Sequence, residues 1–211
     1  TTTGWDKYVI EAGPLRPEAG GLSYDVDGDG DADFIVGGDA QSPDIWWFEN
    51  PRPNFDPNVP WKRHLIKQGG FTAHHDQAMA DFKGTRKPQL MFWNQSAKKL
   101  FMAEQTANPR ESGPGPITEI FDYSKMMAAA TEVTKQGKAV AIKQEGAAVC
   151  DIDGDGRPDL VAGMFWFKHI KENEFKAIRL ADHPGRVAAA WFKPGNLPQI
   201  VIAPCDGDGP C

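Results

Sequence analysis

The sequence predicts an all-β fold built from repeated units of four antiparallel strands. The acidic run at residues 25–33 recurs at residues 151–159, each time directly before a short apolar run. A second marker starts at Trp5 and again at Trp61, in each case 20 residues before an aspartate, Asp25 or Asp81. Two markers at one offset indicate a repeat. The short apolar runs between Gly, Pro, Asn and Asp residues indicate strands rather than amphipathic helices.

The register of the acidic loops sets the expected strands in order. Equivalent positions fall at Asp25, Asp81, Asp151 and Trp191, and an apolar run follows nine residues later each time. In the first three units we expect strands at 20–24, 33–37, 45–48 and 61–66; at 77–80, 89–93, 99–103 and 117–122; and at 147–150, 159–162, 164–167 and 175–180. Strands at 187–191 and 199–203 would form a partial fourth unit.

The same register divides the chain. Residues 1–13 are expected to form the last strand of a preceding unit. Three whole units would then span 14–69, 70–138 and 139–181, with an insertion from 123 to 145 that contains a helical turn, and residues 182–211 would form the partial unit.

Such units in series are typical of a single β-propeller, and a β-sandwich is the alternative. About three and a half blades are present, whereas propellers typically have 4–8. An imperfect four-bladed ring, a piece of a longer protein, and assembly with a second chain, including self-association, all remain open.

The repeated acidic loop predicts a metal site. Carboxylates crowded on one tight turn favour a hard cation with oxygen ligands, Ca²⁺ or Mg²⁺. An EF-hand would need glutamate at position 12 of the loop, where Val36 and Ala162 stand instead. An acidic surface turn without a metal is the remaining alternative. The predicted ligands are Asp25, Asp27, Asp29 and Asp33 in the first loop and Asp151, Asp153, Asp155 and Asp159 in the second.

Composition narrows the class of partner. The net charge of −6 and the lack of a basic stripe argue against nucleic acid. No apolar stretch is long enough to span a membrane. Three cysteines make no disulfide framework: Cys150 is expected to be a small buried residue, while Cys205 and Cys211 either pair or stay free. The localisation stays open, and an extracellular protein is compatible with the sequence.

The same register also aligns polar residues in the loops that lead into the first strand of each unit. These loops are expected to lie together on the face opposite the acidic loops. Imidazole and carboxylate groups that converge on an open pocket suit zinc or general acid–base chemistry. A solvated loop is the competing interpretation for the adjacent His74 and His75, and both histidines reach one ion only if the backbone is irregular there. The candidate catalytic residues are Glu18, His74, His75, Glu145 and His183, with Asp76 and Arg186 at neighbouring positions.

The remaining histidines and the aromatic runs favour plainer roles. His64 lies in an expected strand and is interpreted as structural, and His169 lies in a charged turn where we expect it to be exposed. The aromatic runs at 46–48 and 165–167 are expected to pack between blades, with a sugar-binding platform as the alternative.

The acidic loop with its flanking strands resembles the FG-GAP/VCBS repeat, in which such loops bind calcium. Four further runs resemble the propeller domain of the fungal aldos-2-ulose dehydratase family. These runs read EAGPLRPEAGG from residue 11, WWFENP from 46, HHDQ from 74 and FWNQ from 92.

That resemblance implies a seven-bladed propeller joined to cupin domains, with a catalytic zinc in the propeller and calcium or magnesium in loops. His74 and His75 would be zinc ligands, and Glu18, Glu145 or His183 would be further ligands or the base. The chain lacks the cupin region and about half of the propeller. The expected function is a keto-sugar dehydratase-like lyase or a fragment of one. A non-catalytic, calcium-stabilised propeller that binds a glycan or a protein is the alternative.

Overall fold

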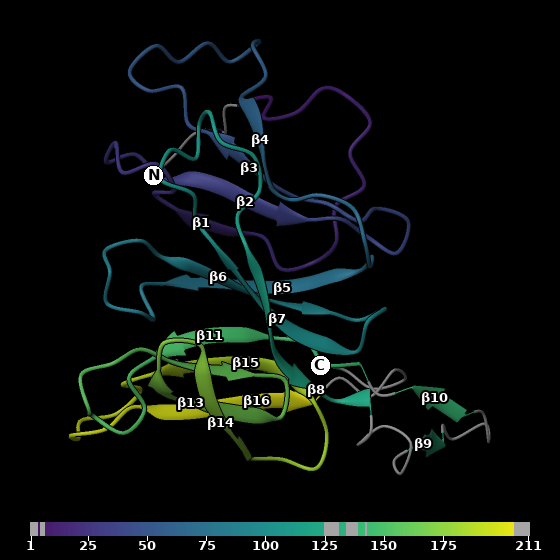
Figure 1. The fold of residues 1–211 in the computed structure, drawn as a ribbon, viewed down its shortest axis with the longest axis vertical. Helices are drawn as coiled ribbons and strands as arrows, with labels where there is room; N and C mark the ends of the chain where they lie inside the picture. Colours follow the sequence, from purple (N-terminus) through teal and green to yellow (C-terminus); the bar gives the residue numbers. More distant parts are fainter. Residues whose placement is uncertain (1–3, 5–6, 125–130, 134–138, 142, 205–211) are drawn as a thin grey trace.

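A computed structural model describes residues 4, 7–124, 131–133, 139–141 and 143–204. Within these residues all the named elements are β-strands, and the prediction of an all-β antiparallel fold is confirmed (Figure 1). The described residues contain no helix that is long and apolar enough to cross a membrane.

The strands form three four-stranded sheets and two hairpins. The first sheet consists of β1 (Leu22–Tyr24), β2 (Asp33–Gly37), β3 (Ile45–Glu49) and β4 (Lys62–Lys67). The second sheet consists of β5 (His74–Ala80), β6 (Gln89–Asn94), β7 (Lys99–Glu104) and β8 (Ile117–Asp122). The third sheet consists of β11 (Ala147–Cys150), β12 (Asp159–Ala162), β13 (Phe165–Lys171) and β14 (Glu174–Arg179). The C-terminal hairpin pairs β15 (Gly185–Ala190) with β16 (Gln199–Pro204), and a short hairpin pairs β9 (Thr131–Val133) with β10 (Ala139–Ala141).

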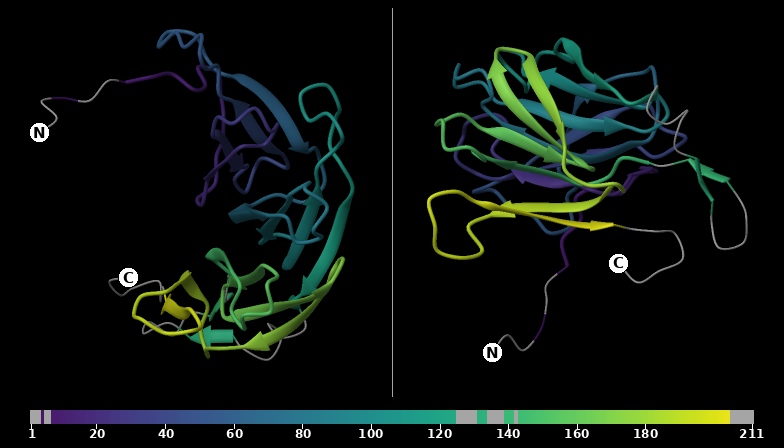
Figure 2. Two further views of the ribbon diagram at one scale, coloured as in Figure 1. Left: turned by 90° about the vertical axis from the view of Figure 1, so that its left-hand side faces the viewer. Right: turned by 90° about the horizontal axis from the view of Figure 1, so that it is seen from below.

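Strands are hydrogen-bonded in chain order within every four-stranded sheet, so each sheet is a simple antiparallel meander. The sheets follow one another around an open arc, from the purple N-terminal part to the yellow C-terminal hairpin (Figure 2). Their first strands lie against one another in series, β1 beside β5, β5 beside β11 and β11 beside β15. Loops at the two ends of these strands therefore gather at two opposite ends of the molecule.

Apolar side chains of neighbouring sheets fill the space between them. Between the first and second sheets Ile35, Trp47 and Phe92 are almost fully buried, and between the second and third sheets Trp93 and Phe167 are. Rings in the second interface meet edge to face, with 5.9 Å between the centroids of Trp93 and Phe167. Burial of a large side chain contributes roughly 1.5–3 kcal/mol. Trp47, Phe165 and Phe167 thus pack between sheets, whereas Trp46 and Phe48 pack on the other face of the first sheet, against Leu15 and Leu65. The rings of residues 46–48 are too buried to form a sugar platform.

At the N-terminal segment and at Cys150 the structure differs from the expectations from the sequence. Residues 7–10 form no strand; backbone bonds from Val9 N to Pro57 O (3.3 Å) and from Trp61 N to Ile10 O (2.9 Å) hold the segment beside the first sheet. The insertion after residue 123 carries the β9–β10 hairpin, while the expected helical turn at 126–130 lies outside the described residues, as do Trp5, Cys205 and Cys211. Cys150 is half-buried rather than buried.

Candidate functional site

The candidate site lies where β5 begins, beside the segment that precedes β1. Asp76 has a positive φ of 43°, and the pairing of β5 with β6 shifts register between His75 and Gln77. The segment before β1 crosses this bulge closely, since Asp76 N donates to Ala19 O at 3.1 Å. Gly20 is required there: its φ is 89°, and a Cβ would lie 2.4 Å from Asp76 Cα. The irregular backbone therefore sets where the side chains of His75 and Asp76 lie.

His75 is held through one ring nitrogen. Its Nδ1 lies 2.6 Å from Asp76 Oδ2, and the same oxygen accepts hydrogen bonds from Gly146 N at 2.7 Å and from Arg186 NH1 at 2.8 Å. Burial raises the pKa of Asp76, but the bonds from His75 and Gly146 and the charge of Arg186 outweigh burial, so the pKa lies below its usual value. An ionised Asp76 assigns the Nδ1 proton to the hydrogen bond and leaves Nε2 for other partners.

The free Nε2 of His75 faces two carboxylates. Glu145 Oε1 lies 3.5 Å away and Glu18 Oε1 lies 4.0 Å away, both beyond hydrogen-bond distance. The His75 side chain is only 8% exposed, whereas the two glutamates are 22% and 26% exposed. The Nε2 side of His75 therefore lies beside two negative charges, and a cation between these groups would be favourable.

Both glutamates are positioned by their neighbours in the chain. Glu18 N donates to Gly37 O at 2.8 Å, at the end of β2. Glu145 lies between Gln144, whose side chain accepts from Met164 N at 3.3 Å, and Gly146, whose carbonyl accepts from Trp93 Nε1 at 3.1 Å. Gly146 has a φ of 77°, and a Cβ there would lie 2.7 Å from Gly185 O. The segments around the site are thus locked to the core.

The donor types at this site, one imidazole and two carboxylates, are those that a borderline metal such as zinc takes. Tetrahedral Zn²⁺ with ligands at about 2.0–2.2 Å separates neighbouring ligand atoms by about 3.4 Å. The 3.5 Å from His75 to Glu145 matches this separation, and the 4.0 Å to Glu18 needs a shift of about half an ångström. The bond from His75 Nδ1 to Asp76 is the outer contact that metal-binding histidines usually make. Among the described residues, three ligand atoms within 4.8 Å of one another occur only in the acidic loops, so a cation here would draw the glutamates closer together.

His74 does not share this arrangement. It alternates with His75 in β5 and is fully buried, with Nδ1 3.2 Å from Gly38 O and its ring 5.6 Å from that of Phe92. Burial, followed by the nearby charge of Lys67, lowers the pKa of His74 to about 4. His74 is therefore a neutral core residue at neutral pH, and the structure separates it from the Nε2 side of His75.

The other sequence candidates fall in different places. His183 is exposed in the bend between β14 and β15, and Arg186 is the residue of this segment that reaches the site, 2.8 Å from Asp76 and 3.4 Å from Glu145. His64 is structural, since its Nε2 lies 2.8 Å from Glu49 and its ring stacks on Trp47. The expectation for His169 is wrong: β13 extends through it, and its ring is 2% exposed against Phe82 and Phe175.

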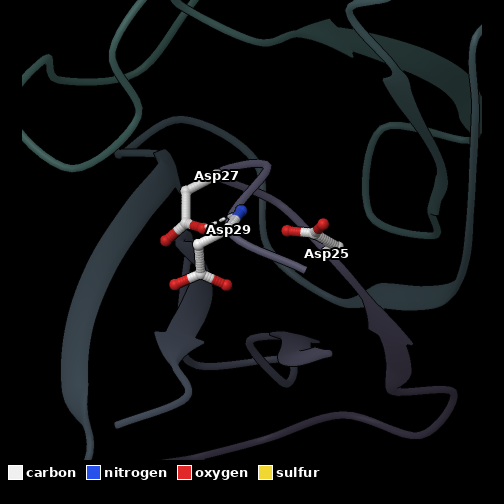
Figure 3. Close-up of side chains that lie close together, drawn as sticks. All are labelled: Asp25, Asp27 and Asp29. Carbon is white, nitrogen blue, oxygen red and sulfur yellow. Dashed lines mark hydrogen bonds between the residues drawn. The ribbon is translucent and has the colours of Figure 1, made fainter. Parts of the chain in front are cut away.

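The acidic loops join the first and second strands of their sheets, at the other end from His75. Figure 3 shows the carboxylates of Asp25, Asp27 and Asp29 gathered on one turn. Asp25 accepts Gly28 N at 2.8 Å and Gly30 N at 3.0 Å, as the tight turn requires. The potential ligand atoms lie within 4.8 Å of one another in the sets Asp25, Asp27, Asp29 and Asp151, Asp153, Asp159.

The ninth position of each loop is turned inward. Asp33 accepts Val26 N and Asn50 N, and Asp159 accepts Ile152 N and His169 N. Burial raises the pKa of Asp33 to about 6, despite these bonds. Gln89 and Gln199 occupy the equivalent place in the other two loops, and each accepts a backbone N–H of its own loop, that of Lys83 and Lys193 respectively. The ninth residue is thus a backbone anchor in all four loops. At the fifth position of the second loop, Asp155 forms an ion pair with Arg157.

Arg186 and Asp76 are the site residues for which the sequence assigned no role. Their signal was the register alone, which placed both on the same face as His75. Comparison of this chain with models of known families, with curated proteins and with solved structures finds no match.

Proposed function

We propose that the three four-stranded sheets are blades of a β-propeller and that the His75 site is its functional centre. Support comes from the meander order of each sheet, the first strands placed side by side and the open arc (Figure 2). A self-associated or second chain that continues the arc is part of this proposal. The loops that meet at the start of β5 would then lie at the mouth of the central channel.

The His75 site is proposed to be a metal-assisted acid–base centre of a keto-sugar dehydratase-like lyase. One observation carries this proposal: His75 is fixed through Nδ1 by an anchored Asp76, while Nε2 faces two partly exposed carboxylates. The similarity of residues 11–21 and 74–77 to the aldos-2-ulose dehydratase family supplies the substrate class. A small, oxygen-rich substrate also suits a site lined by carboxylates and an arginine.

A zinc ion held by His75 Nε2 and Glu145 would polarise a substrate carbonyl, and Glu18, which lies farther from His75, would stay available as the base. The chain's own residues supply the rest of the chemistry. Asp76 keeps the Nδ1 proton in place, and Arg186 offsets the charge of Asp76 and Glu145. Glu18 accepts the proton from the carbon next to the carbonyl. The C–H electron pair becomes the new C=C bond, the hydroxyl on the next carbon leaves, and the proton returns to it as water.

Calcium or magnesium in the acidic loops belongs to the same proposal, as a stabiliser of the turns and not as a reactant. The loops combine clustered carboxylates with glycine turns, and oxygen ligands of this kind suit hard cations. The acidic loops lie at the other end of the strands from His75, so a metal ion bound there would not contact the substrate.

Metal content and turnover test the proposal together. We expect protein purified without chelator to hold about one zinc per His75 site, and His75→Asn and Glu145→Gln to lose it. Glu174→Gln, an exposed carboxylate in β14, is the matched control that should keep it. The full chain is then assayed with anhydrofructose and glucosone for the ultraviolet absorbance of a conjugated enone. Zinc that stays in the His75 variant, or enone formation that is unchanged by its loss, would refute the proposal.

A second candidate function rests on a different cavity. Tyr8, Phe55 and Trp61 line an open cavity of about 760 Å³ that Asp31, Asn50 and Arg52 also border. The rings of Tyr8 and Phe55 lie 4.6 Å apart and are 46% and 37% exposed. Exposed rings beside polar groups favour a non-catalytic propeller that binds a glycan. Titration with a panel of neutral oligosaccharides, compared between the wild type and Phe55→Ala, separates this function from the lyase.

A further inference from the structure

The first acidic loop already contains a positive charge from another sheet. Arg110 lies in the connection between β7 and β8 of the second sheet. Its NH2 is 2.8 Å from Asp27 Oδ2 and 2.6 Å from Asp29 Oδ2, and its Nε is 2.9 Å from Glu49 Oε1. The same connection donates from Gln105 Nε2 to Val26 O at 2.7 Å. Arg110 and Gln105 of the second sheet therefore both bind the acidic loop of the first sheet.

Arg110 balances charge there without satisfying every acceptor. The Asp27 side chain is only 2% exposed, and its Oδ2 makes no directed hydrogen bond although the guanidinium is 2.8 Å away. Asp25, Asp27 and Asp29 thus form a cluster whose potential ligand atoms lie within 4.8 Å of one another (Figure 3), and the Arg110 guanidinium contacts two of its members.

The second acidic loop carries the same motif but has fewer ion pairs from outside the loop. Lys168, from β13 of the same sheet, contacts Asp153 alone. Arg157 lies within the loop and pairs with Asp155. Asp153 Oδ1 is buried without a hydrogen-bond partner and lies in the cluster with Asp151 and Asp159. A divalent cation here would displace one contact, that of Lys168 with Asp153, compared with two contacts of Arg110, with Asp27 and Asp29, in the first loop.

The two remaining loops show a third solution. Lys83 and Lys193 stand near the start of these loops, where the acidic loops have aspartate, and Gln89 and Gln199 replace the ninth aspartate. Lys83 Nζ pairs with Glu104 at 2.8 Å. These loops keep the same backbone anchors with fewer carboxylates, so a built-in positive charge is compatible with this turn.

We propose that Arg110 is the resident cation of the first acidic loop and that the Asp151 loop is the one that takes a divalent cation. Arg110 then both lowers the divalent affinity of the Asp25 cluster and ties two sheets together. The inference rests on the proposal that acidic loops of this kind accept hard cations, and it makes two loops of one motif unequal. A divalent cation among Asp25, Asp27 and Asp29 must break the contacts of Arg110 with Asp27 and Asp29, while Glu49 still holds the guanidinium beside the loop.

Calcium titration of the metal-stripped full chain by calorimetry tests the proposal. A His75→Asn background removes any contribution of the other site. We expect one strong site, which Asp153→Asn abolishes. Arg110→Gln should add a second strong site, and Asp27→Asn should remove that site again. Arg110→Lys, which keeps one point charge, should give an intermediate affinity. Arg52→Gln, an exposed arginine 3.8 Å from Asp31 of the same loop, is the matched control and should change nothing.

Thermal unfolding supplies a second measurement. Without calcium, Arg110→Gln should melt at a lower temperature than the wild type, and calcium should restore it. Two equal strong sites in the wild type, no second site in the arginine variants, or no calcium binding in any variant would each overturn the proposal. Zinc content at His75, measured on the parent chain, is independent of these outcomes, so failure here leaves the lyase proposal to its own test.

Discussion

Replacement of Asp76 by asparagine removes a charge at the centre of the His75 site and little else. Asparagine is nearly isosteric and tolerates the positive φ of 43° at this position. The carboxylate accepts from His75, from Gly146 N and from Arg186 through both oxygens. The amide keeps one acceptor oxygen and turns an NH₂ donor towards other donors. Asp76→Asn therefore isolates the role of the charge.

The magnitude follows from these contacts. A hydrogen bond to a charged group contributes about 1.5–3 kcal/mol, and an unsatisfied buried donor costs about 1–3 kcal/mol. Allowing for one retained bond, Asp76→Asn should destabilise the protein by about 2–4 kcal/mol. For a chain of this length that corresponds to a fall in melting temperature of about 4–16 °C. Because the oriented tautomer of His75 is lost as well, zinc affinity should fall by about 10–100-fold.

Differential scanning calorimetry and a zinc competition assay measure the two effects. Asp39→Asn is the matched control, since Asp39 pairs with Arg16 at 2.8 Å on the surface, where ion pairs contribute little. If both variants melt at the same temperature and bind zinc equally, the charge of Asp76 does not organise the site. A fall in stability without a change in zinc affinity would limit Asp76 to a structural role.

Three further predictions concern stability. Burial raises the pKa of Tyr123 to about 12, so the folded state keeps a proton that the unfolded state loses near pH 10. The free energy of unfolding should therefore fall between pH 10 and 12, by about 1.4 kcal/mol at pH 11. Urea titrations should show this fall for the wild type but not for Tyr123→Phe. Gly20→Ala should unfold the start of β5, because its Cβ would lie 2.4 Å from Asp76 Cα. Gly69→Ala, at a φ of 71° with no atom near the new Cβ, should lower the free energy of unfolding by only about 1 kcal/mol in chemical denaturation. Similar losses of stability in the two variants would contradict this. Removal of calcium by dialysis into calcium-free buffer without a chelator should lower the melting temperature and leave the zinc content unchanged. A joint loss of zinc would argue against separate roles for the two ends.

Register made much of the fold predictable. The apolar run nine residues after each loop start became β2, β6, β12 and β16, because the ninth residue anchors the backbone of its loop in every copy. The same counting placed Glu18, His75 and Glu145 at one end of the molecule, where the structure brings them together. Local periodicity was enough for these features because each repeats the same turn and strand.

Other features depend on contacts that no local pattern contains. The sequence started a strand at Gln77, whereas β5 begins at His74, and this difference decides that His74 is buried while His75 faces the glutamates. The bulge that allows it depends on Gly20, 56 residues earlier in the chain. His169 looked exposed among lysines, yet alternation along β13 turns it onto Phe82 and Phe175. In each case tertiary packing overrode the local signal.

At both ends of the strands, clustered carboxylates are neutralised by an arginine. Crowded carboxylates raise the free energy of the fold unless a positive charge lies among them. Arg186 meets this demand for Asp76 and Glu145, and Arg110 meets it for Asp27 and Asp29. Arg110 comes from the second sheet and contacts the first, whereas Arg186 comes from the C-terminal hairpin and contacts Asp76 of the second sheet, so each arginine also links two separate sheets. The difference lies in what remains unneutralised: at His75 two partly exposed glutamates still face a free imidazole nitrogen, whereas at the first acidic loop the guanidinium already contacts three carboxylates. That remaining need for positive charge is the physical reason to look for a metal first at His75 and at the Asp151 loop, and last at the Asp25 loop.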